Sequence, residues 1–157
     1  MSSIIEFFNA NNLKYTASGS ASNPNNAFDK NDKFTNGCSS PFWMVTFERL
    51  VTIVSYFITS KSSWGAGGWT MKRWDISYSI DGSMFNHLQT DSVSSLHGNT
   101  KKFPLYKQIN CKSFKITAVL DSDGDPCFIF NSFGCFSPVS LKKTINQCSC
   151  NCAHYKN

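Results

Sequence analysis

The sequence feature that most constrains the fold is a run of alternating apolar and polar residues at positions 74–80, WDISYSI. Such alternation is typical of a β-strand with one buried face, and here the residues on that face are Trp74, Ile76, Tyr78 and Ile80. Asp81 and Gly82 follow directly, and both tolerate the positive φ angles of a tight hairpin turn. Apolar residues resume on the returning arm at Met84, Phe85 and Leu88. The stretch therefore predicts a half-buried β-hairpin, which needs further strands as partners.

Other segments have the pattern of short β-strands, at residues 15–18, 42–47, 51–59, 103–105, 114–120, 127–130 and 133–136. Aromatic residues make up 15% of the chain, which suits pleated sheets. The connecting segments are rich in Asn, Gly and Ser. This pattern predicts an all-β fold, a jelly-roll β-sandwich of about eight antiparallel strands.

The 157 residues are expected to form one domain. Ser3 and Glu6 make a capping box that predicts a short N-terminal helix at residues 4–8, within a lead-in of residues 1–14. The sandwich is expected at residues 15–137. Residues 138–157 lose the periodicity, so we expect a flexible, cysteine-containing tail there.

The formal charge of +5 comes from scattered basic residues, which argues against a nucleic-acid surface. No apolar run is long enough for a membrane-spanning helix. No secretory signal is visible, so we expect a cytoplasmic protein, with an extracellular one as the alternative. The seven cysteines lack a regular disulfide spacing and are expected to be free thiols in that reducing compartment.

Several short motifs occur in the order found in a known family. They are Ser20-Ala21-Ser22, Asn26-Ala27-Phe28-Asp29, the aromatic strand at 43–47, the Trp74, Ser79, Asp81 and Gly82 hairpin, Phe114-Lys115-Ile116 and Phe133-Gly134. Through these residues the chain resembles the discoidin family, also called the coagulation factor five/eight type C domain family, over residues 15–136. The resemblance implies a galactose-binding-like jelly roll that binds ligands through loops at one pole and catalyses nothing.

Many members of that family bind a structural calcium ion with the first loop and a glutamate near the final strand. Here the first loop offers four weak calcium candidates, Asp29, Asn31, Asp32 and Thr35. Asn131 stands where the glutamate is expected, and Lys30 replaces the glycine that usually follows Asp29. Because the ligands are too few for calcium, we expect these side chains to cap their own turns and expect no cofactor.

Two further patterns are compatible with a metal ion. Asp121, Asp123 and Asp125 resemble part of an EF-hand loop, but the distal glutamate and the flanking helices are missing. Cys148, Cys150, Cys152 and His154 form a dense cluster of potential zinc or copper(I) ligands. Zinc sites usually space paired cysteines more widely, so an oxidation-prone tail is the favoured interpretation.

Trp64 and Trp69 flank a glycine-rich loop in which burial is not required. A tryptophan on such a loop is a platform for a sugar, a peptide side chain or a lipid, although each ring can instead fold back onto the end of the sandwich. Lys72 and Arg73 lie next to them and offer a charged contact, or else form a solvated strand end.

The binding surface is expected where the segments 22–25, 64–69 and 121–125 meet, because loops from alternate strand ends of a jelly roll gather at one pole. The opposite connections, residues 49–50 and 81–82, are expected to be short turns. The ligand-binding candidates are Ser22, Asn23, Asn25, Trp64, Trp69, Lys72, Arg73 and Asp123.

No catalytic triad is expected, because His87, His97 and His154 have no serine or cysteine partner at a recognised spacing. A metal-dependent enzyme is disfavoured, since the Asp-rich loops lack a histidine or glutamate base. We therefore expect a binding module that docks a protein or a glycan. The alternative is an extracellular carbohydrate-binding or cell-adhesion domain with structural calcium.

Overall fold

The computed structural model describes residues 13–20, 23–28, 35–39, 41–60, 70–94, 96, 99–121, 123–130 and 132–138. The expected helix at residues 4–8 lies outside them, and so does the cluster of Cys148, Cys150, Cys152 and His154. Among the described residues the helical segment is a short 3-10 helix, η1 (Pro24–Phe28), and none is a helix long and apolar enough to cross a membrane.

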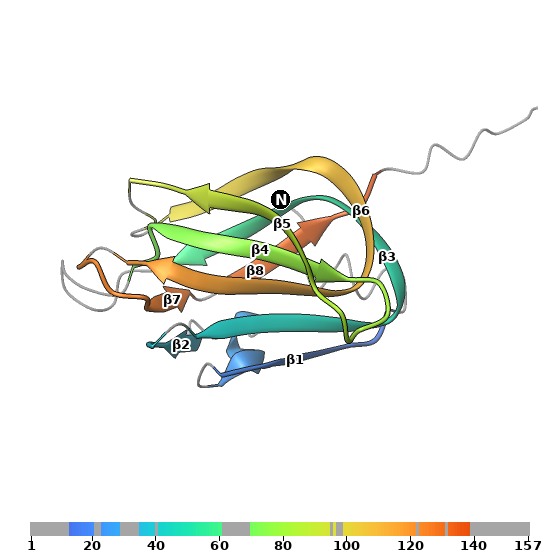
Figure 1. Cartoon of the computed structure of the whole chain (residues 1–157), viewed down its shortest axis with the longest axis horizontal. Helices are drawn as coiled ribbons and strands as arrows, with labels where there is room; N and C mark the ends of the chain where they lie inside the picture. The colour runs from blue at the N-terminus through green and yellow to red at the C-terminus, as the bar shows by residue number, and fades with distance from the viewer. Residues whose placement is uncertain are drawn as a thin grey trace, which may run out of the picture.

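Eight strands in the described part of the chain form two antiparallel sheets, a large one of six strands and a small one of two (Figure 1). The large sheet has the order β1-β3-β6-β4-β5, with β8 also paired to β3, and the small sheet pairs β2 with β7. The strands are β1 (Tyr15–Gly19), β2 (Thr35–Gly37), β3 (Phe42–Ser60), β4 (Arg73–Ser79), β5 (Asn86–Ser92), β6 (Asn99–Leu120), β7 (Phe128–Phe130) and β8 (Ser132–Phe136). The predicted all-β jelly-roll sandwich is confirmed.

Two long strands, β3 and β6, curve around the same end of the molecule and so contribute to both layers (Figure 1). The first part of β3 pairs with β1 and the end of β6, and its second part pairs with β8 and the start of β6. The register of β3 against β6 shifts between Thr46 and Val51, where the side chains of Glu48, Arg49 and Leu50 are exposed. An irregularity of this kind bends a strand without ending it.

The prediction of separate strands at 42–47 and 51–59, joined by a turn at 49–50, is therefore wrong. The bend is a bulge inside one strand. The residues at the bend are exposed, but β3 continues through them and pairs with β6 on both sides. The segments 103–105 and 114–120 likewise belong to one strand, β6.

Aromatic side chains fill the space between the layers. Trp43 on β3 contacts Phe133 on β8, with 4.6 Å between ring centroids, and Trp74 on β4 meets Phe103 edge-on at 5.1 Å. The ring of Phe28 in η1 contacts that of Tyr15 on β1 in a tilted arrangement, with 4.6 Å between centroids, so η1 is attached to the core. Pairs of this geometry add specific stabilisation beyond the area they bury.

The β4–β5 hairpin forms as predicted, but its turn is wider than two residues. Trp74 and Ile76 are fully buried, whereas Ile80 is 57% exposed because it has already left the strand. The Asp81 Oδ1 atom accepts hydrogen bonds from Ser79 Oγ (2.8 Å) and from the backbone N–H groups of Ser83 (2.8 Å) and Met84 (3.0 Å). These bonds hold the pKa of the Asp81 carboxyl below its ordinary value, and the two backbone bonds contribute most to that shift. The turn is thus an aspartate-capped loop between β4 and β5.

Candidate functional site

The two ends of the sandwich differ in what they carry (Figure 1). At one end lie β2, β7 and the connection between β6 and β7, and we call this end the loop pole. At the other end lie the bends of β3 and β6 and the β4–β5 turn, and we call this the bend pole. The turn at Asp81 and Gly82 therefore lies away from the loop pole, as predicted.

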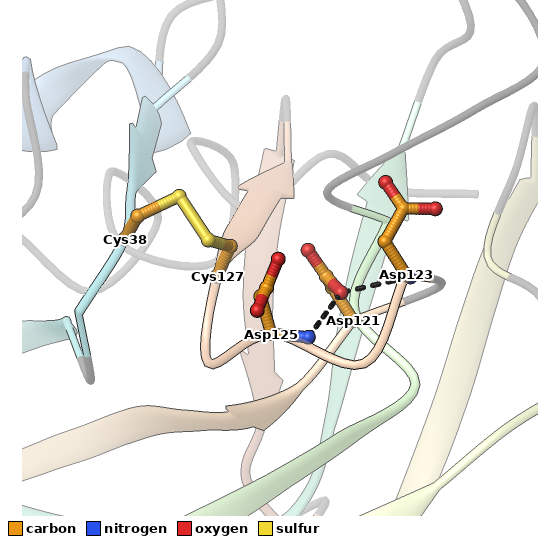
Figure 2. Close-up of a disulfide and its surroundings, with 5 residues drawn as sticks. All are labelled: Cys38, Asp121, Asp123, Asp125 and Cys127. Carbon is orange, nitrogen blue, oxygen red and sulfur yellow. Dashed lines mark hydrogen bonds between the residues drawn. A yellow bond between two sulfur atoms is a disulfide. The ribbon is translucent and has the colours of Figure 1, made fainter.

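A disulfide between Cys38 and Cys127 links the end of β2 to the start of β7 at the loop pole (Figure 2). The two residues are 89 positions apart in sequence, and the pairing of Gly37 with Phe128 brings their Cα atoms to 4.1 Å. The prediction that these cysteines are free thiols is wrong. The two residues meet only because β2 pairs with β7, so their spacing in the sequence did not indicate a disulfide.

Two other cysteines in the described residues, Cys111 and Cys135, are free and buried. Burial raises the pKa of the Cys111 thiol to about 12 and that of Cys135 well above its ordinary value. Thiols held neutral in this way are poor nucleophiles and poor metal ligands.

The connection between β6 and β7 is organised by one buried carboxylate, that of Asp121. Its Oδ1 atom accepts hydrogen bonds from the backbone N–H groups of Asp123 and Asp125, each at 2.9 Å (Figure 2). Asp125 in turn accepts bonds through its carbonyl oxygen from the N–H groups of Asp121 and Cys127, both at 2.8 Å. Gly124 has φ 98°, a left-handed conformation that glycine adopts without strain. The result is a closed acidic turn rather than an EF-hand loop.

The structure describes five of the eight predicted ligand-binding residues. The side chains of Asn23, Asn25, Arg73 and Asp123 are exposed and that of Lys72 is half-buried. Asn23 begins the turn into η1, where its carbonyl oxygen accepts a bond from the N–H of Asn26 (2.9 Å). Ser22, Trp64 and Trp69 lie outside the described residues, as do the calcium candidates Asp29, Asn31 and Asp32. Thr35, the remaining calcium candidate, begins β2.

Backbone contacts tie the segment after residue 69 to the acidic turn. Thr70 forms a bridge with Ile129 of β7, and the N–H of Lys72 donates to the carbonyl oxygen of Leu120 at the end of β6 (2.8 Å). The strand that follows the predicted Trp64–Trp69 loop therefore enters the sandwich beside the 121–127 connection.

One polar cluster outside the loop pole has the residue types of a catalytic site. On β4 and β5, His87 Nε2 lies 3.5 Å from Asp75 Oδ1 and 3.3 Å from Thr90 Oγ1. A relay needs the carboxylate and the nucleophile on opposite ring nitrogens, and here both contact the same one. Thr90 also donates its proton to Asp75 at 2.6 Å, so it is not activated as a nucleophile. In the described part of the chain no three His, Cys, Asp or Glu side chains gather to hold a metal ion.

Sequence reasoning missed two features of the loop pole, the disulfide and the buried position of Asp121. The disulfide had no signal in the cysteine spacing. Asp121 did have one, because an aspartate directly after an alternating strand and two residues before Asp123 is well placed to cap its own turn.

No protein-family model matches the sequence, and no curated protein matches it. Solved structures do match in fold. The F5/8 type C domain of a Bacteroides fragilis protein is 14% identical, with a TM-score of 0.68, and the match covers 78% of this chain and 91% of that one. The chain has the discoidin-type fold.

Two further matches are carbohydrate-binding modules solved with sugars. CpGH89CBM32-5 from Clostridium perfringens, in complex with GalNAc-β-1,3-galactose, is 15% identical with a TM-score of 0.66, over 87% of this chain and all of that one. The CBM32 of AlyQ, in complex with 4,5-unsaturated mannuronic acid, is 14% identical with a TM-score of 0.63, over 77% and 93% of the two chains. The chain therefore shares its jelly-roll fold with both F5/8 type C and CBM32 domains.

Proposed function

We propose that this protein is a non-catalytic module that binds a glycan through the loop pole. The observation that carries the proposal is the likeness in fold, over most of the chain, to modules solved with GalNAc-β-1,3-galactose and with 4,5-unsaturated mannuronic acid. The arrangement of the Asp75, His87 and Thr90 cluster, which lacks a relay, fits a binding role rather than catalysis. No observation in the described residues favours docking to a protein, the other expected use.

The candidate contacts at the loop pole suit a carbohydrate. The rings of Trp64 and Trp69 would stack on the apolar face of a sugar, since an indole offers a large flat surface with little entropy to lose. Exposed amides of Asn23 and Asn25 and the cations of Lys72 and Arg73 would bond to hydroxyl or carboxylate groups. The disulfide and the closed acidic turn hold part of this pole rigid, which lowers the entropic cost of binding.

The proposal is tested by a glycan array that includes galactosides and uronic-acid oligosaccharides, followed by calorimetry with the best ligand. The double variant W64A/W69A should lose binding by at least about tenfold while its stability stays within ~1 kcal/mol. Met84→Ala, at a side chain 75% exposed near the bend pole, is the matched control and should bind as the parent does. Full binding by the double variant would move the site elsewhere, and protein capture without any glycan binding would favour the docking alternative.

We further infer that the chain folds in an oxidising compartment, which favours the extracellular alternative over the cytoplasm. Disulfides persist outside the cell and are rare in the reducing cytosol. The Cys38–Cys127 bridge supports this inference. Thiol alkylation of the protein isolated from its native source, with and without reduction, would detect the bridge by mass. A fully alkylated Cys38 before reduction would contradict it.

A further inference from the structure

The acidic turn between β6 and β7 contains a buried carboxylate oxygen that the described hydrogen bonds do not explain. Asp121 is fully buried, and its Oδ1 atom takes both backbone bonds of the turn. Its Oδ2 atom is also buried and has no hydrogen-bond partner among the residues that the structure describes. A buried carboxylate oxygen without a donor is costly, so such an atom in a stable fold calls for a proton, a water molecule or a cation.

A second carboxylate lies on the same side of the turn as this oxygen. In Figure 2 the oxygen of Asp121 that carries no hydrogen bond points to the side of the turn on which the Asp125 carboxylate lies. The Asp123 carboxylate stands apart from both. Asp125 is exposed, so it offers a ligand on the solvent side of the same small region. Two carboxylates on one side of a turn repel each other unless a positive ion lies between them.

The backbone of the turn is fixed independently of any ion. Four hydrogen bonds among Asp121, Asp123, Asp125 and Cys127 close it, and the Cys38–Cys127 disulfide holds its far end. The two carboxylates are therefore presented on a rigid support, which is the condition for a preformed ion site.

We propose that Asp121 and Asp125 bind a calcium ion at the loop pole. Calcium takes six to eight oxygen ligands in irregular geometry, so backbone carbonyl oxygens and water would supply most of its shell. What sets this turn apart from the first-loop candidates is the buried oxygen of Asp121, to which no described group donates a hydrogen bond. Magnesium demands a regular octahedron and gives up water reluctantly, and the turn supplies no nitrogen or thiolate ligand for zinc. The site differs from the first-loop candidates Asp29, Asn31, Asp32 and Thr35, and it does not depend on the glycan proposal. With only two carboxylates we expect a dissociation constant of about 10⁻⁴–10⁻³ M.

The test measures the melting temperature of the full-length, chelator-treated protein as calcium chloride is added to about 10 mM at constant ionic strength. The wild-type midpoint should rise by about 3–10 °C, with a smaller rise for magnesium. Asp125→Asn should abolish the rise. Asp121→Asn should also abolish it, while its amide oxygen keeps the two backbone bonds and so preserves the fold. Asp123→Asn is the matched control, since it removes one charge from the same turn, and it should retain the rise.

Several results would overturn the proposal. No calcium-dependent rise in the wild type would exclude the site. A rise that survives in Asp121→Asn and Asp125→Asn would place the ion elsewhere, for example in the first loop. A rise lost in Asp123→Asn as well would indicate general charge screening rather than a site.

Discussion

A single hydroxyl group, that of Tyr56, connects polar side chains from both layers of the sandwich. Trp74 Nε1 donates to Tyr56 Oη at 2.7 Å, and Tyr56 Oη donates to the Asp91 carboxylate. Gln89 Nε2 donates to both oxygens of that carboxylate, at 2.9 and 2.8 Å. Burial and the nearby carboxylate raise the pKa of Tyr56 far above its ordinary value, so the hydroxyl stays protonated. The network is therefore fully satisfied inside an otherwise aromatic core.

We expect Tyr56→Phe to destabilise the fold by ~2–3 kcal/mol, although it leaves the ring and its packing in place. The loss removes the acceptor for the Trp74 N–H and one donor to Asp91, and unpaired buried polar groups are costly. Urea unfolding measures the change. Tyr106→Phe deletes the same hydroxyl from a side chain that is 65% exposed, and it should stay within ~0.5 kcal/mol of the parent. Equal stability of both variants would show that the Tyr56 hydroxyl contributes nothing.

At the scale of elements, the small sheet depends on its disulfide. β2 and β7 have three residues each, and a pair this short is not stable alone. The Cys38–Cys127 bridge closes a long loop, since the two cysteines are 89 positions apart, and so removes many conformations from the unfolded chain. Together with the pairing of β2 and β7, the bridge links the first loop to the acidic turn.

Replacing both cysteines, Cys38→Ser with Cys127→Ser, should therefore lower stability by about 2–5 kcal/mol. Reductant should lower the wild-type melting temperature in the same direction and leave the double variant unchanged. That variant is the matched control, because it keeps the buried thiols Cys111 and Cys135. A wild-type melting temperature that reductant does not move would contradict the bridge and restore the interpretation as free thiols.

The strands that the sequence predicted well are those with an apolar alternation of their own. Trp74 and Ile76 of β4 are buried as their spacing indicated. The alternation ends there, because the pairing with β5 shifts register after Ile76; Tyr78 is half-buried and Ser79 is buried instead. β2 was hidden, since Thr35, Asn36 and Gly37 have no apolar residue and pair only because β7 arrives beside them. The continuity of β3 through Glu48, Arg49 and Leu50 was also hidden, because exposed residues at a bulge have the composition of a turn.

At the scale of the whole molecule, the proposed binding surface lies at the opposite end of the sandwich from the structural bends. At the bend pole, β3 and β6 bend without a break in the strand. The β4–β5 turn beside them is closed by backbone hydrogen bonds to the Asp81 side chain. The loop pole holds the disulfide, the acidic turn and the candidate contacts Asn23, Asn25 and Arg73. The positions of these poles followed from the order of the strands, whereas the bridge joins residues 89 positions apart in sequence, which no local pattern indicates.

This separation predicts that a change at the bend pole alters stability without altering ligand affinity. Asp81→Ala removes the acceptor of three hydrogen bonds that close the β4–β5 turn, so the melting temperature should fall. Because these bonds hold the pKa of Asp81 below its ordinary value of 3.8, their contribution is complete near neutral pH and is lost as the pH falls below about 4. The difference in melting temperature between parent and variant should therefore narrow at about pH 2.

Affinity for the best glycan, measured by calorimetry at neutral pH and a temperature where both proteins are folded, should be the same for Asp81→Ala and the parent. Asp81→Asn is the matched variant, because its amide oxygen still accepts the backbone bonds of Ser83 and Met84 while the charge is gone. It should recover part of the lost stability and none of the pH dependence. A tenfold loss of affinity in Asp81→Ala would show that the β4–β5 turn contacts the ligand, and the division of the molecule into a binding pole and a structural pole would then be wrong.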